Sequence, residues 1–169
     1  PAKELKTKKK AGKIPADLEE FMKQVTWKLD GSRLDIHGER IYYMPEGLPD
    51  VRGIRFLRTG LLLGELKKNR FEPSHALALA LRKENAMLSC SLNADGEELR
   101  SYLNGESLRV EGEKGWYLIC ADDYSIGWGK WAGGMMKNHY PKGLRKNWQK
   151  FQILTWSRWR RKCSMQEAT

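Results

Sequence analysis

One stretch of this 169-residue chain, residues 127–145, interleaves cations, aromatic rings and glycines in a pattern suited to nucleic acid. Lysine and arginine neutralise phosphates, and a flat aromatic face stacks on a base for about 1–3 kcal/mol. Asparagine and histidine supply donors and acceptors for base edges and 2′-hydroxyls. The residues expected to contact RNA here are Trp128, Lys130, Lys137, Asn138, His139, Tyr140, Lys142 and Arg145. For the tryptophans, the alternative is that they belong to a core that the cations merely surround.

A second basic cluster consists of Lys67, Lys68 and Arg70. We include these three residues among the candidates for RNA contact, because clustered cations attract phosphates. The alternative is that they form an ordinary solvated turn, as charge clusters of this size commonly do.

The distribution of charge supports a polyanionic partner. The net charge is +10, with 31 Lys and Arg against 21 Asp and Glu. Residues 124–166 contain ten of these cations, five tryptophans and no acid, so the rest of the chain is neutral overall. A field this concentrated attracts RNA. A solubilising tail is the alternative, but such tails are seldom rich in tryptophan.

The sequence shows no sign of catalysis. It has no glycine-rich cofactor loop, no nucleophile elbow and no Ser/His/Asp spacing. Cys90 and Cys120 lie in apolar runs, where a cysteine is usually inert packing. The cysteines form no C-x-x-C pair, and their odd number indicates a reducing interior. We therefore expect no catalytic residue, no metal and no cofactor, and the apolar runs are too short to span a membrane.

The first part of the chain should form a small α+β domain. Apolar residues at helical spacing predict a helix over 15–25, and alternating runs predict strands at 33–37, 41–44, 54–57 and 61–63. Residues 71–74 interrupt the pattern, and Ser74 is a plausible N-cap for a helix to about residue 82. Residues 76–81 are apolar on every side, which predicts a helix buried all round between two layers.

A second unit begins near residue 87. The pattern predicts a strand at 88–92, a helix at 97–103 that ends before Gly105, and strands at 108–110, 115–121 and 125–131. Frequent glycine turns favour a small β-barrel or curled sheet. The expected fold class is therefore α+β, with two small domains.

The expected division is a basic leader or linker (1–14), an intermediate domain (15–86), the second domain (87–146) and a basic, Trp-rich tail (147–169). The tail has helical spacing of its aromatic residues. It is expected either to lie on the second domain as a terminal helix or to form an extra RNA-contacting arm.

Two long strings resemble one known family. Residues 60–81 (GLLLGELKKNRFEPSHALALAL) and residues 127–145, with GWGK and MKNHYPKGLR, are similar to the C-terminal half of the RsmF-like, Sun-type ribosomal RNA cytosine-5 methyltransferases. The strings YLNGE at 102–106 and KGW at 114–116 resemble the same region. The likeness covers about residues 16–145, and the tail departs from it.

In that family, a methyltransferase domain that binds S-adenosylmethionine and uses a cysteine nucleophile precedes an intermediate domain and a PUA-like RNA-binding domain. The resemblance implies that this chain consists of the intermediate domain and the PUA-like RNA-binding domain. It contains neither a Pro-Cys nor a Thr-Cys motif, so no catalytic residue carries over. S-adenosylmethionine is expected only in a linked catalytic domain.

The expected partners are ribosomal RNA and that methyltransferase domain in the same polypeptide, in the cytoplasm and away from membranes. Two alternatives stay open. The chain could be a stand-alone RNA-binding protein, or a protein-interaction module whose basic end docks an acidic partner.

Overall fold

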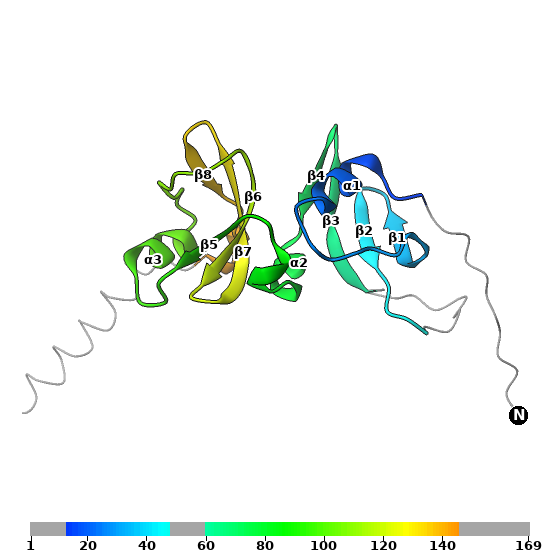
Figure 1. Cartoon of the computed structure of the whole chain (residues 1–169), viewed down its shortest axis with the longest axis horizontal. Coiled ribbons are helices and arrows are strands. Elements are labelled where there is room, and N and C mark those ends of the chain that lie inside the picture. Colours follow the sequence, from blue (N-terminus) through cyan, green and yellow to red (C-terminus); the bar gives the residue numbers. More distant parts are fainter. Residues whose placement is uncertain (1–12, 48–59, 146–169) are drawn as a thin grey trace, which may run out of the picture.

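The computed structural model describes residues 13–47 and 60–145. These residues form two four-stranded sheets that stand side by side, with three α-helices packed on or between them (Figure 1). The expected α+β class is confirmed. The strand expected at 54–57, the tail at 147–169 and nearly all of the leader at 1–14 lie outside the described residues.

The N-terminal unit is an antiparallel sheet in the order β1-β2-β3-β4, preceded by one helix. Its elements are α1 (Ala16–Met22), the 3-10 turn η1 (Gly31–Arg33), β1 (Leu34–His37), β2 (Arg40–Tyr43), β3 (Leu61–Lys67) and β4 (Arg70–Pro73). A two-residue turn joins β3 to β4, and Asn69 takes the left-handed conformation there with a φ of 57°. Asparagine tolerates this conformation better than most residues.

Strand β4 departs from the sequence expectation, which placed an interruption at residues 71–74. The proline at its end pairs with Gly64 on β3, and Phe71 is buried. The Phe71 ring lies where a Cβ on Gly64 would stand, so only glycine allows this close approach. The hydrogen-bonded register with β3 therefore overrides the local turn-like composition.

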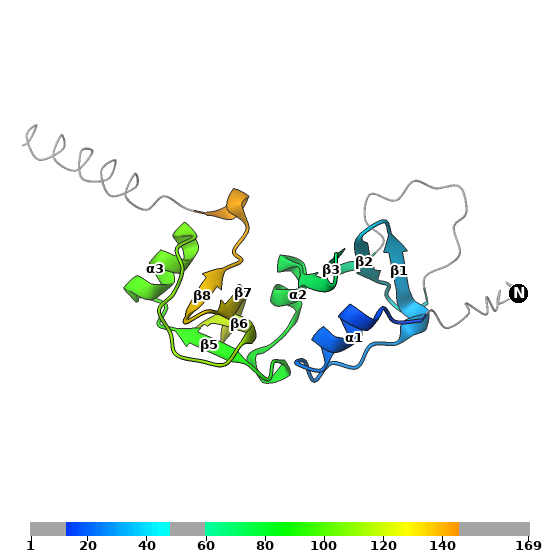
Figure 2. The ribbon, with the colours of Figure 1, turned by 90° about the horizontal axis from the view of Figure 1, so that it is seen from above.

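Helix α2 (His75–Ala80) lies between the two sheets, against β3 on one side and β7 on the other (Figures 1 and 2). The Ser74 hydroxyl accepts a hydrogen bond from the Leu77 N–H at 3.0 Å, which confirms the expected N-cap. Leu77 and Ala78 are buried, but Leu79 is 57% exposed. The expectation of burial on every side was wrong, because the helix is short and its outer face meets solvent.

The C-terminal unit is a sheet in the order β5-β6-β7-β8, with β5 parallel to β6 and the other pairs antiparallel. Its elements are η2 (Lys83–Asn85), β5 (Ser89–Leu92), α3 (Glu97–Asn104), β6 (Gly115–Ala121), β7 (Tyr124–Ala132), β8 (Met135–Asn138) and η3 (Lys142–Leu144). Gly105 ends α3 in the left-handed conformation, as expected. The strand expected at 108–110 is a single bridge from Leu108 to Met136 on β8, a strand that the sequence pattern did not reveal. Within the described ranges, closure of this sheet into a barrel is not detected.

One hydrophobic core spans both units. Phe21 and Phe71 of the N-terminal unit pack with Trp116 and Trp128 of the C-terminal unit. The ring centroids of Phe21 and Trp128 are 5.6 Å apart, in an edge-to-face arrangement. The Trp128 indole N–H also donates to the Ser74 carbonyl at 2.8 Å. A second cluster fills the space under α3, so both faces of the C-terminal sheet are covered over much of their area.

Candidate nucleic-acid interface

A row of side chains crosses the C-terminal sheet on the face that looks toward the N-terminal unit. Trp116 on β6 is paired with Lys130 on β7, and Lys130 is paired with Lys137 on β8. Directly paired residues on neighbouring strands point to the same face with Cβ atoms about 5 Å apart. The Lys130 ammonium lies 5.1 Å from the Trp116 ring centroid, a cation–π distance. Lys137 is exposed.

His139 continues this row two residues beyond Lys137. Its ring lies 4.6 Å from the Trp116 ring, and its backbone N–H donates to the Trp128 carbonyl at 3.1 Å. Burial against the indole lowers the pKa of His139, and nearby Lys130, Lys137 and Arg70 lower this pKa further, while Glu72 opposes them. The cations of both units therefore converge on this point.

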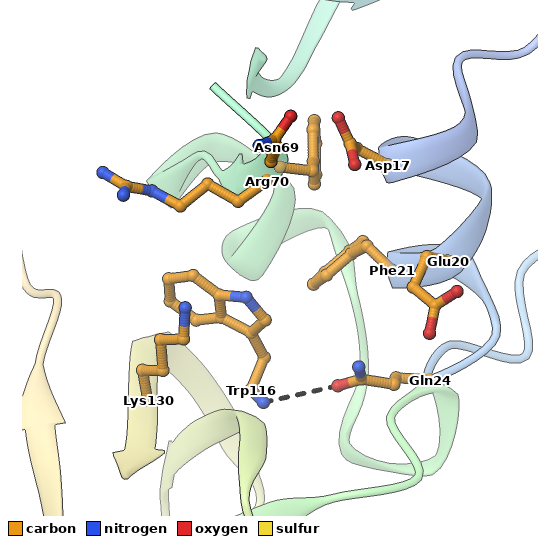
Figure 3. A pocket seen from close by; sticks show the side chains of 9 residues that line it. Asp17, Glu20, Phe21, Gln24, Asn69, Arg70, Trp116 and Lys130 are labelled. Atoms are coloured by element: carbon orange, nitrogen blue, oxygen red, sulfur yellow. Dashed lines mark hydrogen bonds between the residues drawn. The ribbon is translucent and has the colours of Figure 1, made fainter. Parts of the chain in front are cut away.

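Arg70 reaches this region from β4 of the N-terminal unit. It lines a cleft of about 190 Å³ together with Lys130 and Trp116, between α1 and the C-terminal sheet (Figure 3). The fold thus joins two basic clusters that are far apart in the sequence. Arg70 is exposed and makes an ion pair with Glu72 at 2.9 Å. Lys68, in the adjacent turn, is exposed.

Lys67 does not share in this surface. Its ammonium lies 2.8 Å from a carboxylate oxygen of Glu39 and 2.8 Å from one of Glu65. The hydrogen bonds that Lys67 donates to Glu39, and then to Glu65, raise the pKa of Lys67 above its usual range. Because two carboxylates hold this lysine, we leave it out of the candidate surface, although the sequence pattern had included it.

Trp128 is only 2% exposed and belongs to the shared core. Its neighbours Phe21 and Trp116 stand edge-on to it. A buried indole has no free face for a base, so the alternative of a core tryptophan describes Trp128, and we remove it from the candidate surface. Trp131 is half-buried and donates its indole N–H to the Val110 carbonyl at 3.0 Å.

Asn138 holds the end of α3. Its amide nitrogen donates to the Tyr102 carbonyl at 2.7 Å and to the Glu106 carbonyl at 2.8 Å, and its oxygen accepts from the Tyr140 N–H at 2.7 Å. Both N–H donors of the amide are therefore committed. Asn138 has no donor left for a base edge, which removes it from the candidate surface.

Tyr140 and Arg145 fasten the segment that follows β8. The Tyr140 ring packs against His75 and Tyr102, with centroids 5.5 Å away in both cases. The Arg145 guanidinium donates to the Tyr140 carbonyl at 3.2 and 3.3 Å and lies against Gly105. Both side chains have structural partners, so we leave them out of the candidate surface and assign them a structural role.

The candidate surface that remains consists of the exposed or half-exposed residues Lys68, Arg70, Lys130, Lys137, His139 and Lys142. Trp116 is buried, at 8% exposure, and supports this surface from beneath through its contact with Lys130, a role that the sequence pattern did not indicate. Its place opposite Lys130 depends on the register between β6 and β7. A search for aromatic partners across predicted hairpins would have indicated it.

Within the described ranges, no three or more His, Cys, Asp or Glu side chains are grouped as metal ligands would be. No helix in those ranges has the length and apolar character needed to cross a membrane.

Comparison with known protein families adds to this geometry. Residues 20–81 match the family model described as the RsmF rRNA methyltransferase first C-terminal domain. Residues 90–146 match the model described as the methyltransferase RsmF PUA domain. The two models lie on the two sheets and the elements that flank them.

Curated relatives carry the same family name. The ribosomal RNA small subunit methyltransferase F of Vibrio cholerae serotype O1 is 32% identical over 107 residues, which are 62% of this chain and 22% of that protein. The protein of the same name from Photobacterium profundum is 29% identical over 164 residues, 88% of this chain and 34% of that protein. The chain thus spans a fifth to a third of the length of these relatives. It belongs to the RsmF-like ribosomal RNA methyltransferases and corresponds to their C-terminal region.

Proposed function

We propose that this chain is the RNA-binding accessory region of a ribosomal RNA methyltransferase. It holds structured ribosomal RNA for a cytosine-5 methyltransferase domain in the same polypeptide, and that domain binds S-adenosylmethionine. The observation that carries the proposal is the row of Lys130 and Lys137 on β7 and β8, which Arg70 joins from the other unit. The names of the relatives support ribosomal RNA as the class of substrate.

The chain's own residues supply affinity through phosphates. Lys130, Lys137 and Lys142 form no ion pair among the residues that the structure describes, so their charge is available to a polyanion. Phosphate contacts fix position and orientation, whereas shape and base contacts provide selectivity. The accessory region therefore positions RNA and leaves the chemistry to the linked domain. We propose that this RNA binding takes place in the bacterial cytoplasm, where ribosomal RNA is found.

The salt dependence of RNA binding tests the proposal. If about six cations contact phosphates, the slope of log K against log salt is about −4. Replacing Lys137 and Lys142 with alanine should weaken binding and flatten this slope by about 1.4, since each contact contributes about 0.7. The matched control replaces Arg100 and Arg109, two exposed cations outside the candidate surface, and should leave the slope close to the parent value. Fluorescence anisotropy with a structured ribosomal RNA fragment between about 50 and 300 mM salt measures both.

The competing functions give different outcomes. A flat salt response in the parent, or equal losses in the two double variants, would contradict the proposed surface. A module that docks an acidic protein would bind RNA no better than any other polyanion. Reading the coding region upstream of Pro1 separates an accessory region from a stand-alone RNA-binding protein, because only the former follows a methyltransferase domain.

A further inference from the structure

The cleft between the two units has the size of a site for one flat ring. It measures about 190 Å³, below the roughly 300–1,000 Å³ of pockets that take drug-sized molecules. One wall is α1, the opposite wall is formed by β6 and β7, and the β3–β4 turn closes one end (Figure 3). The walls approach from different units, so neither unit forms this cleft alone.

The lining of the cleft is apolar inside and charged at two rims. Phe21, Phe71 and Trp116 line the cleft from the core, where each is more than nine-tenths buried, and the rings of Phe21 and Phe71 are 5.1 Å apart. Arg70 and Lys130 stand on the side of the C-terminal sheet, and Figure 3 shows both cationic side chains beside the Trp116 indole. The cations and aromatics together favour a flat ligand that carries a negative charge.

The other rim carries carboxylates from α1. Asp17 and Glu20 both line the cleft, and Glu20 is already paired with Lys23 at 3.6 Å. Asp17 is half-buried and forms no ion pair among the described residues, so it is the carboxylate available to a ligand. A ligand that is only anionic would be repelled by Asp17, and one that is only cationic would be repelled by Arg70 and Lys130. The occupant must therefore present an anion at one end and N–H donors at the other.

The walls are held at a fixed separation. The Gln24 side-chain oxygen accepts a hydrogen bond from the Trp116 backbone N–H at 3.3 Å and so ties the turn that follows α1 to β6 (Figure 3). The bridge between Val25 and Ala86 adds a backbone connection on the same side. A site that is already formed loses little conformational entropy when it binds.

We infer that this cleft binds one unpaired nucleotide of the RNA. The phosphate lies at Arg70 and Lys130, and the base lies in the cleft over its aromatic lining, with its amino-bearing edge toward Asp17. Cytosine donates from its N4 amino group to a carboxylate, whereas uracil presents an acceptor oxygen at the same position and is repelled. The inference rests on the proposed RNA binding and adds a preference for amino-bearing bases over uracil.

The test compares two RNA hairpins with the same stem and with loops of cytosine only or uracil only. Anisotropy at one salt concentration should show the parent chain binding the cytosine loop about tenfold more tightly. Asp17→Ala should abolish this preference by weakening the cytosine complex about tenfold, with the uracil complex unchanged or slightly stronger. Glu19→Ala removes the same charge from the same turn of α1 outside the cleft, and should keep the parent's preference.

The sign of the Asp17→Ala effect decides between recognition and simple repulsion. If Asp17 only repels RNA, its removal strengthens both complexes equally, and the inference is overturned. If the parent binds both loops equally with a steep salt slope, the cleft has no such role but the proposed function stands. If the parent binds neither hairpin, the proposed function fails and the inference with it. Circular dichroism of each variant confirms that α1 and the sheets are intact.

Discussion

The two sheets carry their cations in different ways. In the N-terminal unit, Arg33 lies 2.8 Å from Glu46, and Arg40 and Lys67 also have carboxylate partners. In the C-terminal unit, Lys130 and Lys137 have no ion-pair partner among the described residues. An exposed ion pair contributes only about 0–1 kcal/mol to stability, but it cancels the long-range field of its cation. Cations without a carboxylate partner, more than the number of cations, therefore make the C-terminal sheet the surface suited to RNA.

Removing the core side chain that joins the two sheets should have the largest effect on the molecule. Trp128→Ala should destabilise the chain by about 3–5 kcal/mol, because it leaves a cavity in the core that both units share. Urea unfolding followed by circular dichroism measures the change. Trp128→Phe keeps most of the volume but loses the hydrogen bond to Ser74, and should cost about 1–2 kcal/mol. A loss below about 1 kcal/mol for the alanine variant would contradict a shared core.

A direct test removes two charges from each sheet in turn. Replacing Lys130 and Lys137 with glutamine should weaken RNA binding about tenfold at about 100 mM salt. Each of these lysines is expected to neutralise a phosphate and thereby to release a counterion when RNA binds. Replacing Arg40 and Lys67 with glutamine removes equal charge from carboxylate-paired positions, and should weaken binding by no more than about twofold. Equal losses measured by anisotropy would show that net charge alone determines affinity.

Removing the carboxylate partner of a cation in the candidate surface should strengthen RNA binding. Glu72→Gln leaves Arg70 without its carboxylate, beside Lys130 and His139. We expect RNA affinity to rise about threefold and the salt slope to steepen by about 0.7. Glu46→Gln, which frees Arg33 in the N-terminal unit, is the control and should change neither quantity appreciably. An unchanged affinity for Glu72→Gln would place Arg70 outside the interface.

RNA binding should also depend weakly on pH through His139. The pKa of His139 is lowered by burial and by the cations around it, so the ring is mainly neutral at about pH 7. A bound phosphate would raise that pKa, and binding would then take up a proton. Affinity should therefore increase about two- to threefold as pH falls from about 7.5 to 5.5. The same titration with His139→Gln should be nearly flat, and a parallel response in both proteins would exclude His139 as the sensor.

Local sequence patterns predicted much of the fold. The helical spacing of apolar residues located α1, and Ser74 and Gly105 marked one end of α2 and of α3 correctly. Strand β4 was missed because its formation depends on pairing with β3 and on the close approach of Phe71 to Gly64. Strand β8 was also missed, because the charges and glycines of the surrounding stretch obscured its strand pattern.

The candidate site was harder to predict than the fold. Residue type alone cannot distinguish Lys130, which is free of ion pairs among the described residues, from Lys67, which two carboxylates hold. Nor does it show that Asn138 uses both amide N–H donors to hold the end of α3. These outcomes depend on contacts between residues distant in the sequence. The cleft is also formed by contacts between distant residues, because Gln24 and Trp116 meet only when both units have folded.

The shared core also has a consequence for synthesis. Phe21 and Leu77 belong to a cluster that Trp116 and Trp128 complete, so the N-terminal unit cannot finish its core until residue 128 has left the ribosome. At about 5–20 residues per second, that delay lasts several seconds, during which apolar side chains remain uncovered. A nascent chain arrested at residue 86 is therefore expected to be cut readily by a protease. One arrested well beyond residue 145 should resist.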